Sequence, residues 1–280
     1  MAVQIIRLPQ KMQRKALAIR KAGKTIAFVP TMGALHEGHL SLIDLARKKA
    51  DYVVVSVYVN PTQFGPKEDF SRYPRPFKTD AALCKLRGTD IIFNPDNLYA
   101  PDSSTWINEE TLSTGLCGGA RPGHFRGVTT VVGKLFNLVL PHVAVFGQKD
   151  AQQVAVIERM VRDLDFPLKI IRAPITREPD GLAMSSRNIY LSPDERQKAV
   201  ILSQTLKTAK QMARDGKNPK QIAQTIGKMI AQFAPDARID YIELRHSQSL
   251  IPLKQIVPRK TLVALAVYFG KTRLIDNAVI

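Results

Sequence analysis

Two histidines, His36 and His39, stand three residues apart in the sequence HEGH, at the start of a predicted amphipathic helix. Residues at this spacing lie on one side of a helix turn, so both imidazoles can face the same ligand. A helix N-terminus also presents unpaired N–H groups and a positive dipole end, which suit phosphate. Gly33 and Gly38 let the backbone approach that ligand closely. The stretch therefore predicts a nucleoside triphosphate site, with imidazoles donating to phosphate oxygens as charge develops.

Other interpretations of the histidine pair stay open on the residues alone. The two rings can be surface side chains beside a helix cap, with no ligand at all. A zinc site is disfavoured because HEGH is one residue short of the H-E-x-x-H spacing. No cluster of Cys and His elsewhere supplies further metal ligands.

Three further polar motifs could take part in the same site. In Asn60–Phe64, the Gln63 amide both donates and accepts hydrogen bonds, which suits a substrate with hydroxyl and carboxylate groups. Gly147–Asp150 pairs a phosphate-seeking lysine with a carboxylate that can hold ribose hydroxyls or cap the next helix. Met184–Arg187 offers two hydroxyls and a guanidinium, a predicted phosphate clamp. The sequence has no Walker A motif and no G-x-G-x-x-G, which argues against P-loop and dinucleotide sites.

The motifs are separated by segments whose hydrophobic pattern predicts strands alternating with helices. This alternation predicts an α/β fold with a doubly wound, mostly parallel sheet, in which ligands bind at the carboxyl ends of the strands. The pattern changes near residue 176, where two helical segments, about 194–215 and 219–233, precede three strand-like runs. We therefore expect a nucleotide-binding domain over residues 1–175 and a smaller α+β domain over residues 176–280 that acts as a lid.

The composition is that of an ordinary globular protein, with 280 residues, 45% of them hydrophobic and 23% charged. The longest apolar runs are too short to span a bilayer, and the N-terminus lacks a secretory h-region. Only two cysteines occur, Cys84 and Cys117, with no C-x-x-C, so neither a disulfide framework nor a zinc ribbon is expected. These features predict a cytoplasmic protein that does not associate with membranes.

The net charge of +17 is the unusual total. Most basic residues are scattered along predicted helices, as on solvated faces that attract small anionic substrates, although a polyanion partner stays an alternative. Within the run RPGHFRG, the side chains of Arg121, His124 and Arg126 either add positive charge to the site or fix a loop over it.

Taken together, these stretches resemble the pantothenate synthetase family, a branch of the nucleotidyltransferase superfamily with its HxGH signature. The matching pieces are PTMGALHEGHLSL, VYVNPTQFGPKEDFSRYPR, LCGGARPGHFRGVTTVVGKLFNLVLP, VFGQKDAQQ and DGLAMSSRNIYLS, in family order. The resemblance implies a Rossmann-like sheet followed by the family's smaller C-terminal domain. It also implies a ligase that condenses pantoate with β-alanine through a pantoyl adenylate, using ATP and releasing AMP and diphosphate, in pantothenate and coenzyme A biosynthesis.

The resemblance also assigns roles to individual residues. The implied ATP-binding positions are Met32, Gly33, Ala34, Leu35, His36, Glu37, Gly38, His39, Gly147, Gln148, Lys149, Asp150, Thr176, Met184, Ser185, Ser186 and Arg187. Catalysis is expected from His36, Lys149, Arg187 and His39, the last at the position assigned as proton donor. Gln63 matches the glutamine shared by pantoate and β-alanine, and Gln153 matches a second pantoate contact.

Magnesium is expected to bind chiefly through the ATP phosphates. The family usually has Y-P-R-T where this chain has Tyr73–Pro76, and its acidic run is reduced here to Phe77–Asp80, which leaves Asp80 as the candidate protein ligand. The implied partners are the three small substrates and a second copy of the chain, with the strand-rich region 53–59 as a possible contribution to a homodimer. Nucleic acid is not expected.

Two other functions remain as alternatives. One is an adenylyltransferase of the same superfamily that stops at nucleotidyl transfer. The other is a nucleic-acid-binding protein built on a synthetase-like core, for which the chain has little length left for a binding module.

Overall fold

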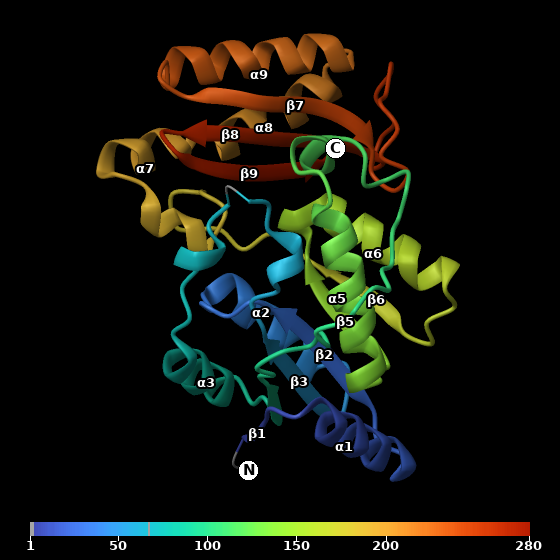
Figure 1. Ribbon diagram of the computed structural model, residues 1–280. Coiled ribbons are helices and arrows are strands. Elements are labelled where there is room, and N and C mark those ends of the chain that lie inside the picture. Colours follow the sequence, from blue (N-terminus) through green and yellow to red (C-terminus); the bar gives the residue numbers. More distant parts are fainter. Residues whose placement is uncertain (1–2, 67) are drawn as a thin grey trace.

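A six-stranded parallel sheet forms the N-terminal part of the computed structural model, which describes residues 3–66 and 68–280 (Figure 1). Its strand order is β1-β4-β3-β2-β5-β6. The strands are β1 (Gln4–Ile6), β2 (Ile26–Thr31), β3 (Tyr52–Val57), β4 (Ile91–Phe93), β5 (Val143–Gly147) and β6 (Lys169–Ala173). Lys67, inside the predicted loop 60–76, lies outside the described residues.

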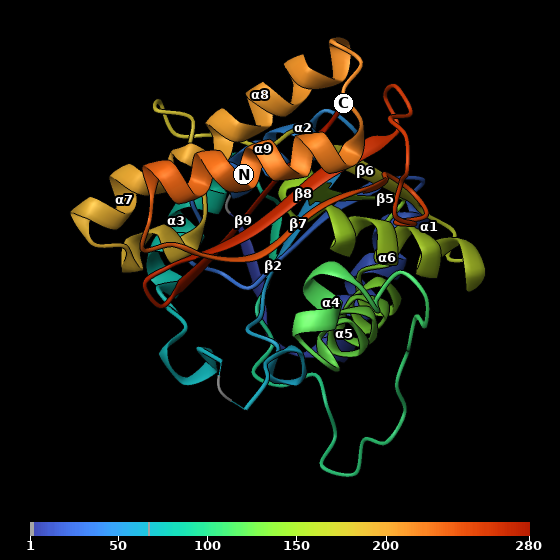
Figure 2. The ribbon, with the colours of Figure 1, turned by 90° about the horizontal axis from the view of Figure 1, so that it is seen from above.

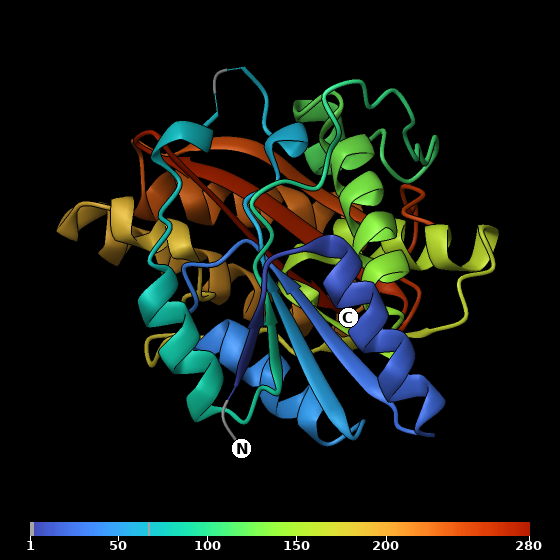
Figure 3. The ribbon, with the colours of Figure 1, turned by 60° about the horizontal axis from the view of Figure 1, so that its bottom comes forward.

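Helices cover both faces of this sheet, so the doubly wound arrangement predicted from the sequence is confirmed (Figure 3). The helices are α1 (Pro9–Lys21), α2 (Glu37–Arg47), α3 (Phe77–Leu86), α4 (Leu116–Ala120), α5 (His124–Val139) and α6 (Ala151–Asp163). Alternate residues of the strands pack against the helices on opposite faces of the sheet. Phe28 and Phe146 pack with α1, α5 and α6, whereas Val29 and Val145 pack with α2 and α3. Such two-sided burial explains why the strands are nearly continuous apolar runs.

The order of the strands reverses between β2 and β5, which are neighbours in the sheet although far apart in sequence. From β2 the chain winds outward to β3 and β4, and then returns to β5 and β6 on the other side. Loops that leave such a switch point diverge and open a crevice at the carboxyl ends of the strands. The loops after β2 and β5 are those that carry HEGH and Gly147–Asp150.

The C-terminal part is an antiparallel sheet covered by helices, as expected for an α+β unit (Figure 2). Its elements are α7 (Pro193–Ala199), α8 (Ile201–Arg214), α9 (Pro219–Phe233), β7 (Arg238–His246), β8 (Thr261–Phe269) and β9 (Thr272–Val279). The first predicted helical segment, 194–215, is two helices that meet at Val200. There, the N–H of Val200 bonds to the carbonyl of Gln197, three residues back, instead of continuing the α-helical pattern.

The central strand of this sheet, β8, is buried on both of its faces. Leu262 and Ala264 pack against the core of the N-terminal part, whereas Val263 and Val267 pack beneath α8 and α9. The two parts therefore share one apolar interface, and the predicted boundary between residues 175 and 176 falls in the connection after β6. That boundary, and the role of the C-terminal part as a lid, stay predictions.

The region 53–59, suggested above as a contribution to a homodimer, contains β3, which lies between β2 and β4 with Val53–Val57 buried in the sheet. This strand has no free edge to offer a partner. The homodimer itself stays a prediction. In the described part of the chain, no helix combines the length and the apolar character needed to cross a membrane.

Candidate active site

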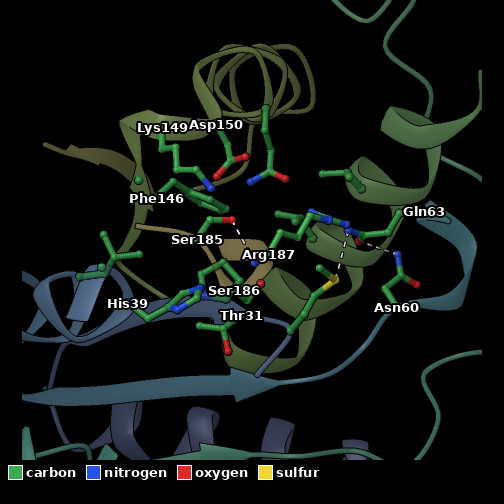
Figure 4. Close-up of a pocket in the computed structure, with 18 of the residues that line it drawn as sticks. Thr31, His39, Asn60, Gln63, Phe146, Lys149, Asp150, Ser185, Ser186 and Arg187 are labelled. Carbon is green, nitrogen blue, oxygen red and sulfur yellow. Dashed lines mark hydrogen bonds between the residues drawn. The ribbon is translucent and has the colours of Figure 1, made fainter. Parts of the chain in front are cut away.

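A crevice of about 240 Å³ opens at the carboxyl ends of β2 and β5, beneath the C-terminal sheet. It gathers residues from segments that are far apart in the sequence (Figure 4). The predicted site residues among its lining are Met32, His36, Gly38, His39, Gln63, Gly147, Lys149, Asp150, Gln153, Thr176, Met184, Ser185, Ser186 and Arg187. Five predicted ATP-binding residues are not part of that lining, namely Gly33, Ala34, Leu35, Glu37 and Gln148.

The two histidines begin α2 and cap it with their own rings. Nδ1 of His36 accepts the N–H of Gly38 at 3.1 Å, and Nδ1 of His39 accepts the N–H of His36 at 3.4 Å. The ring centroids are 4.1 Å apart. A neutral imidazole whose Nδ1 accepts must carry its proton on Nε2. Both rings therefore keep an Nε2–H donor free of these capping bonds, available to a ligand in the crevice.

The surroundings keep both rings uncharged. Burial, followed by the charge of Lys149, lowers the pKa of His36 from 6.5 to about 4. Burial lowers the pKa of His39 to about 3, with further contributions from His36 and Lys149. At neutral pH the pair thus offers hydrogen bonds, while the basic side chains that line the crevice are those of Arg121, Lys149 and Arg187. The prediction that the imidazoles donate to phosphate is compatible with this geometry.

Glycine at position 38 is required by the close packing of the cap. A Cβ built there would meet Nδ1 of His36 at 2.8 Å and Cβ of Met184 at 3.6 Å. The turn therefore brings the Met184 loop against the histidines. A side chain at this position would displace the ring of His36 from the Gly38 N–H.

Asp80 holds the loop between β2 and α2, a role that sequence reasoning missed. Its carboxylate, 1% exposed, accepts the N–H of Ala34 at 2.9 Å and the N–H of Leu35 at 2.8 Å. Ala34 has φ of 50° and Gly33 has φ of 82°, so the carboxylate stabilises a left-handed turn. Burial raises the pKa of Asp80, and the two N–H donors oppose that shift. Its oxygens face this backbone, and Asp80 is not among the crevice residues.

The turn Gly147–Asp150 brings an ammonium group and a carboxylate to the crevice from the end of β5. Asp150 occupies the N-cap position of α6, but its side chain makes no capping bond. Its carboxylate lines the crevice instead (Figure 4). Of the two glutamines that follow, Gln153 lines the crevice. Gln152 is instead structural, because it accepts the N–H of Cys117 at 2.9 Å and donates to the carbonyl of Leu112 at 2.8 Å.

The Asn60–Phe64 motif is fixed by close contact with helix α5. Gln63 receives a hydrogen bond from Asn60 Nδ2 at 3.1 Å and directs its own Nε2 toward the sulfur of Met32 at 3.3 Å (Figure 4). The same Asn60 nitrogen donates to the carbonyl of Gly127 at 3.1 Å. A Cβ on Gly127 would lie 2.4 Å from the carbonyl oxygen of Thr62, so only glycine lets the helix approach this turn.

The run RPGHFRG fixes the loop over the crevice. Arg121 pairs with Glu68 at 2.6 Å and touches Nε2 of His124 at 2.9 Å. Nδ1 of His124 lies 2.9 Å from the carbonyl oxygen of Gln63. Arg126 stacks on the ring of Trp106 instead and does not line the crevice. Of the two roles left open for these residues, the structure favours loop fixation.

The Met184–Arg187 segment reaches the crevice from the C-terminal side, with Arg187 near its middle (Figure 4). Ser185 Oγ accepts the N–H of Arg187 at 3.3 Å. The guanidinium of Arg187 pairs with Asp69 of the 60–76 loop at 3.1 Å, an ion pair that bridges the two sides of the crevice. Although burial disfavours its charge, this partner keeps the pKa of Arg187 above its usual value. Neither acidic residue of the loop, Glu68 or Asp69, was singled out from the sequence, because only tertiary contact reveals their partners.

The described residues contain no group of three or more His, Cys, Asp or Glu side chains arranged to hold a metal ion. Asp150 is the one carboxylate among the described residues that line the crevice. A single carboxylate suits a hard cation that is bound mostly by a substrate's phosphates. The two cysteines, Cys84 and Cys117, are both buried and free.

Comparison with known proteins finds relatives along almost the whole chain. The family described as Pantoate-beta-alanine ligase matches residues 4–279. A pantothenate synthetase from Thermotoga petrophila is 51% identical over 281 residues, covering 99% of this chain and 100% of that protein. The crystal structure of a pantothenate synthetase from Thermus thermophilus superposes with a TM-score of 0.93 at 41% identity, covering 99% of both chains. A Francisella tularensis pantoate-beta-alanine ligase, solved in complex with beta-gamma ATP and beta-alanine, gives a TM-score of 0.79 at 34% identity and covers 99% of this chain and 98% of that chain.

Proposed function

The chain belongs to the pantoate–β-alanine ligase family, and we propose how its crevice residues divide the work of that family's reaction. The protein is an AMP-forming ligase that condenses pantoate with β-alanine at the expense of ATP. The observation that carries the assignment of roles is the convergence of the neutral imidazoles of His36 and His39, the ammonium group of Lys149 and the guanidinium group of Arg187 on a single crevice.

The reaction needs two steps because oxide is a poor leaving group from a carboxylate. In the first step, a carboxylate oxygen of pantoate attacks the α-phosphorus of ATP, and the bond from that phosphorus to diphosphate breaks. In the second step, the β-alanine amine attacks the acyl carbon of the pantoyl adenylate. The bond between that carbon and the AMP oxygen breaks, and the amine nitrogen loses a proton. The protein contributes mainly position and charge stabilisation.

His36, His39, Lys149 and Arg187 stabilise the charge that develops on the triphosphate. The Nε2–H groups of the imidazoles can donate hydrogen bonds to phosphate oxygens. A neutral ring makes these bonds without transferring its proton to the phosphate in the ground state. Lys149 supplies a point charge and Arg187 a forked donor set. Thr176, Ser185 and Ser186 add short hydroxyl contacts, and the other lining residues of the two turns, Met32, Gly38, Gly147 and Asp150, form the rest of the nucleotide site.

Gln63 serves both acyl substrates, with Gln153 as a second contact to pantoate. The amide of Gln63 is held by Asn60 and by the packing of α5, which fixes its direction. The Francisella tularensis ligase, which was solved with beta-gamma ATP and beta-alanine, supports binding of both molecules in one crevice here. A labile adenylate must be shielded from water. The Asp69–Arg187 ion pair supports closure between the 60–76 loop and the Met184–Arg187 segment.

Magnesium would be held mainly by the phosphate oxygens of ATP, and Asp150, the carboxylate of the described crevice lining, is the residue that would contribute to it. When bound, the ion would neutralise phosphate charge. The site of action is the cytoplasm, in agreement with two free buried cysteines, and the enzyme is a homodimer, as expected for its family. Neither nucleic acid nor membrane is a partner in this proposal.

A half-reaction assay tests the assignment. Diphosphate release from ATP should require Mg²⁺ and pantoate but not β-alanine, while the amide product should require all of them. His39→Ala should lower the rate of the first step, measured as diphosphate release, by about 100-fold or more. An unchanged rate of diphosphate release in this variant would remove His39 from the mechanism.

A further inference from the structure

The final strand, β9, carries two polar residues that are almost completely buried and that the reaction described above does not use. Asp276 is 2% exposed and Asn277 is 4% exposed. Burial of a carboxylate or an amide costs free energy unless hydrogen bonds compensate for lost water. Both side chains have such partners. Apart from the N–H of Asn277, which donates to Asp276 at 2.8 Å, these partners belong to the turn that carries Lys149 and to the segment that precedes Met184–Arg187.

Asn277 binds the turn that carries Lys149. Its Nδ2 donates to the carbonyl of Gln148 at 3.0 Å and to the carbonyl of Lys149 at 2.9 Å. The side chain of Gln148 returns a longer bond to Oδ1 of Asn277, at 3.4 Å. Because two carbonyls can only accept, the amide nitrogen must face them, and this use exhausts its two protons. The direction of the peptide on either side of Lys149 is thus set by a residue of the C-terminal sheet.

Asp276 binds the base of the loop that ends in Met184–Arg187. It forms a two-pronged ion pair with Arg177, at 2.6 and 2.9 Å. Arg177 also donates to the carbonyl of Gly181 at 3.0 Å, and its backbone pairs with that of Ala183. Arg177 therefore closes the loop on itself and anchors it to β9. Truncation of one partner of such a buried pair leaves an uncompensated charge.

Adjacent residues of a strand point to opposite faces, so neighbours 276 and 277 reach opposite sides of β9. The neighbours of the pair confirm the two faces: Ile275 packs against the N-terminal core, while Leu274 lies in the core under the helices. One dipeptide thereby connects two catalytic segments that have no covalent connection near the crevice.

We propose that Asp276 and Asn277 are positioning residues for the adenylation step. Together they hold the Lys149 turn and the Arg187 loop in fixed positions relative to each other. This inference rests on the proposed roles of Lys149 and Arg187 in ATP use. Neither residue of the pair lines the main crevice, although both line a smaller adjoining cavity that shares Lys149 and Arg187 with it. Their side-chain hydrogen bonds go to the two segments, and we infer that each residue acts through the segment it holds. Movement of the C-terminal sheet relative to the parallel sheet is transmitted to Lys149 through Asn277.

The test is a double-mutant cycle between Asn277 and Lys149, read out as kcat/KM for ATP in pantoate-dependent diphosphate release. Asn277→Ala should lower this value by about 10-fold or more, because misplacement of a catalytic group by 1 Å can cost about 100-fold. The second step, followed by single turnover of preformed adenylate with β-alanine, should change much less. In a Lys149→Ala background, the additional loss from Asn277→Ala should disappear, since the group it positions is already absent.

Matched variants separate positioning from general loosening. Ile275→Val, on the same strand and face, loosens packing without removing a polar contact and should leave kcat/KM for ATP unchanged. Asn277→Ser, which keeps one donor, should recover part of the lost activity and serves as the probe if the alanine variant folds poorly. Asp276→Asn should lower ATP use as well, and Asp276→Glu, which keeps the charge, should recover part of it.

The outcomes distinguish the role of Lys149 in ATP use from the positioning role of Asn277. If Lys149→Ala itself leaves ATP use unchanged, the proposed function of Lys149 fails. If Lys149→Ala impairs ATP use but the Asn277→Ala loss persists in full on that background, the positioning role is overturned and Asn277 is a general structural residue. Equal losses of kcat/KM for ATP in Ile275→Val and Asn277→Ala would also overturn the positioning role of Asn277.

Discussion

Replacement of Gly127 by alanine should damage pantoate use from a position outside the crevice lining. Gly127 lies in α5, where its missing side chain leaves room for the Asn60–Phe64 turn. A Cβ at this position would stand 2.4 Å from the carbonyl oxygen of Thr62 and 2.7 Å from the backbone nitrogen of Gln63. Ordinary C···O contacts begin at about 3.3 Å, so the turn must retreat by about 1 Å. The obstacle is backbone, which cannot rotate away as a side chain can.

The size of the effect follows from that displacement. A shift of about 1 Å in a substrate-positioning group can cost about 100-fold in rate. Alanine also has a higher helix propensity than glycine, by about 1 kcal/mol, which offsets part of the overpacking cost of about 1–3 kcal/mol. We therefore expect Gly127→Ala to remain folded while its kcat/KM for pantoate falls by about 10- to 100-fold.

Diphosphate release at varied pantoate, with β-alanine omitted, measures this effect directly, and the melting temperature reports folding. Gly133→Ala is the matched control, because it is the same substitution in the same helix. Its Cβ would meet Cδ1 of Ile107 at 2.5 Å, the mobile end of a side chain. The control should retain pantoate use. Normal pantoate kinetics in a folded Gly127→Ala variant, or an equal loss in Gly133→Ala, would refute the reasoning about Gln63.

Three further predictions concern the crevice itself. Lys149→Ala should weaken use of ATP more than use of β-alanine in steady-state kinetics, and the reverse order would mean that its role is assigned to the wrong substrate. In the folded protein, the pKa of His36 is about 4 and that of His39 is about 3, whereas an unburied histidine has a pKa of 6.5. Below pH 6.5 the unfolded chain therefore binds more protons at these two histidines than the folded protein does. The free energy of unfolding should thus fall as pH decreases from 6.5 toward 4, with a smaller fall in His36→Asn; urea titrations at pH 7.5 and 5 that give the two proteins the same pH dependence would contradict this. Asp80→Asn should destabilise the protein by about 1–3 kcal/mol through a lost acceptor and slow the first step. Its activity should not recover in excess Mg²⁺, whereas full recovery would restore Asp80 as a metal ligand.

Much of the fold was predictable because burial on both faces leaves a strong signal. The apolar β-branched run 52–57 and the helical spacing of Leu40 and Ile43 mark β3 and α2 without tertiary information. The predicted helices 9–21 and 219–233 match α1 and α9, because a proline marks the first residue of each helix. The break at Val200 left no such mark, as neither glycine nor proline stands there.

The site was predictable at the level of its motifs but not of its supports. Motif residues such as His36, Lys149 and Arg187 follow recognisable sequence patterns and do reach one crevice. The side chains that hold them are distant in sequence: Asp69 lies 118 residues from Arg187, and Asn277 lies 129 residues from Gln148. No local pattern encodes such a pairing, because it depends on how the two sheets pack.

The same limit explains the prediction about Asp80. The family resemblance left Asp80, in the reduced acidic run 77–80, as the candidate magnesium ligand, and the sequence alone does not show which way its carboxylate points. In the folded chain, its oxygens are occupied by the N–H groups of Ala34 and Leu35, and it supports the histidine loop from behind.

The most direct test of carboxylate activation follows oxygen atoms through the reaction. Pantoate labelled with ¹⁸O in both carboxylate oxygens should be converted with ATP and β-alanine, and the products analysed by mass spectrometry. One labelled oxygen should appear in the phosphate of AMP, one in the amide carbonyl of the product, and none in diphosphate. AMP without label, or label in diphosphate, would contradict an acyl adenylate formed in this crevice.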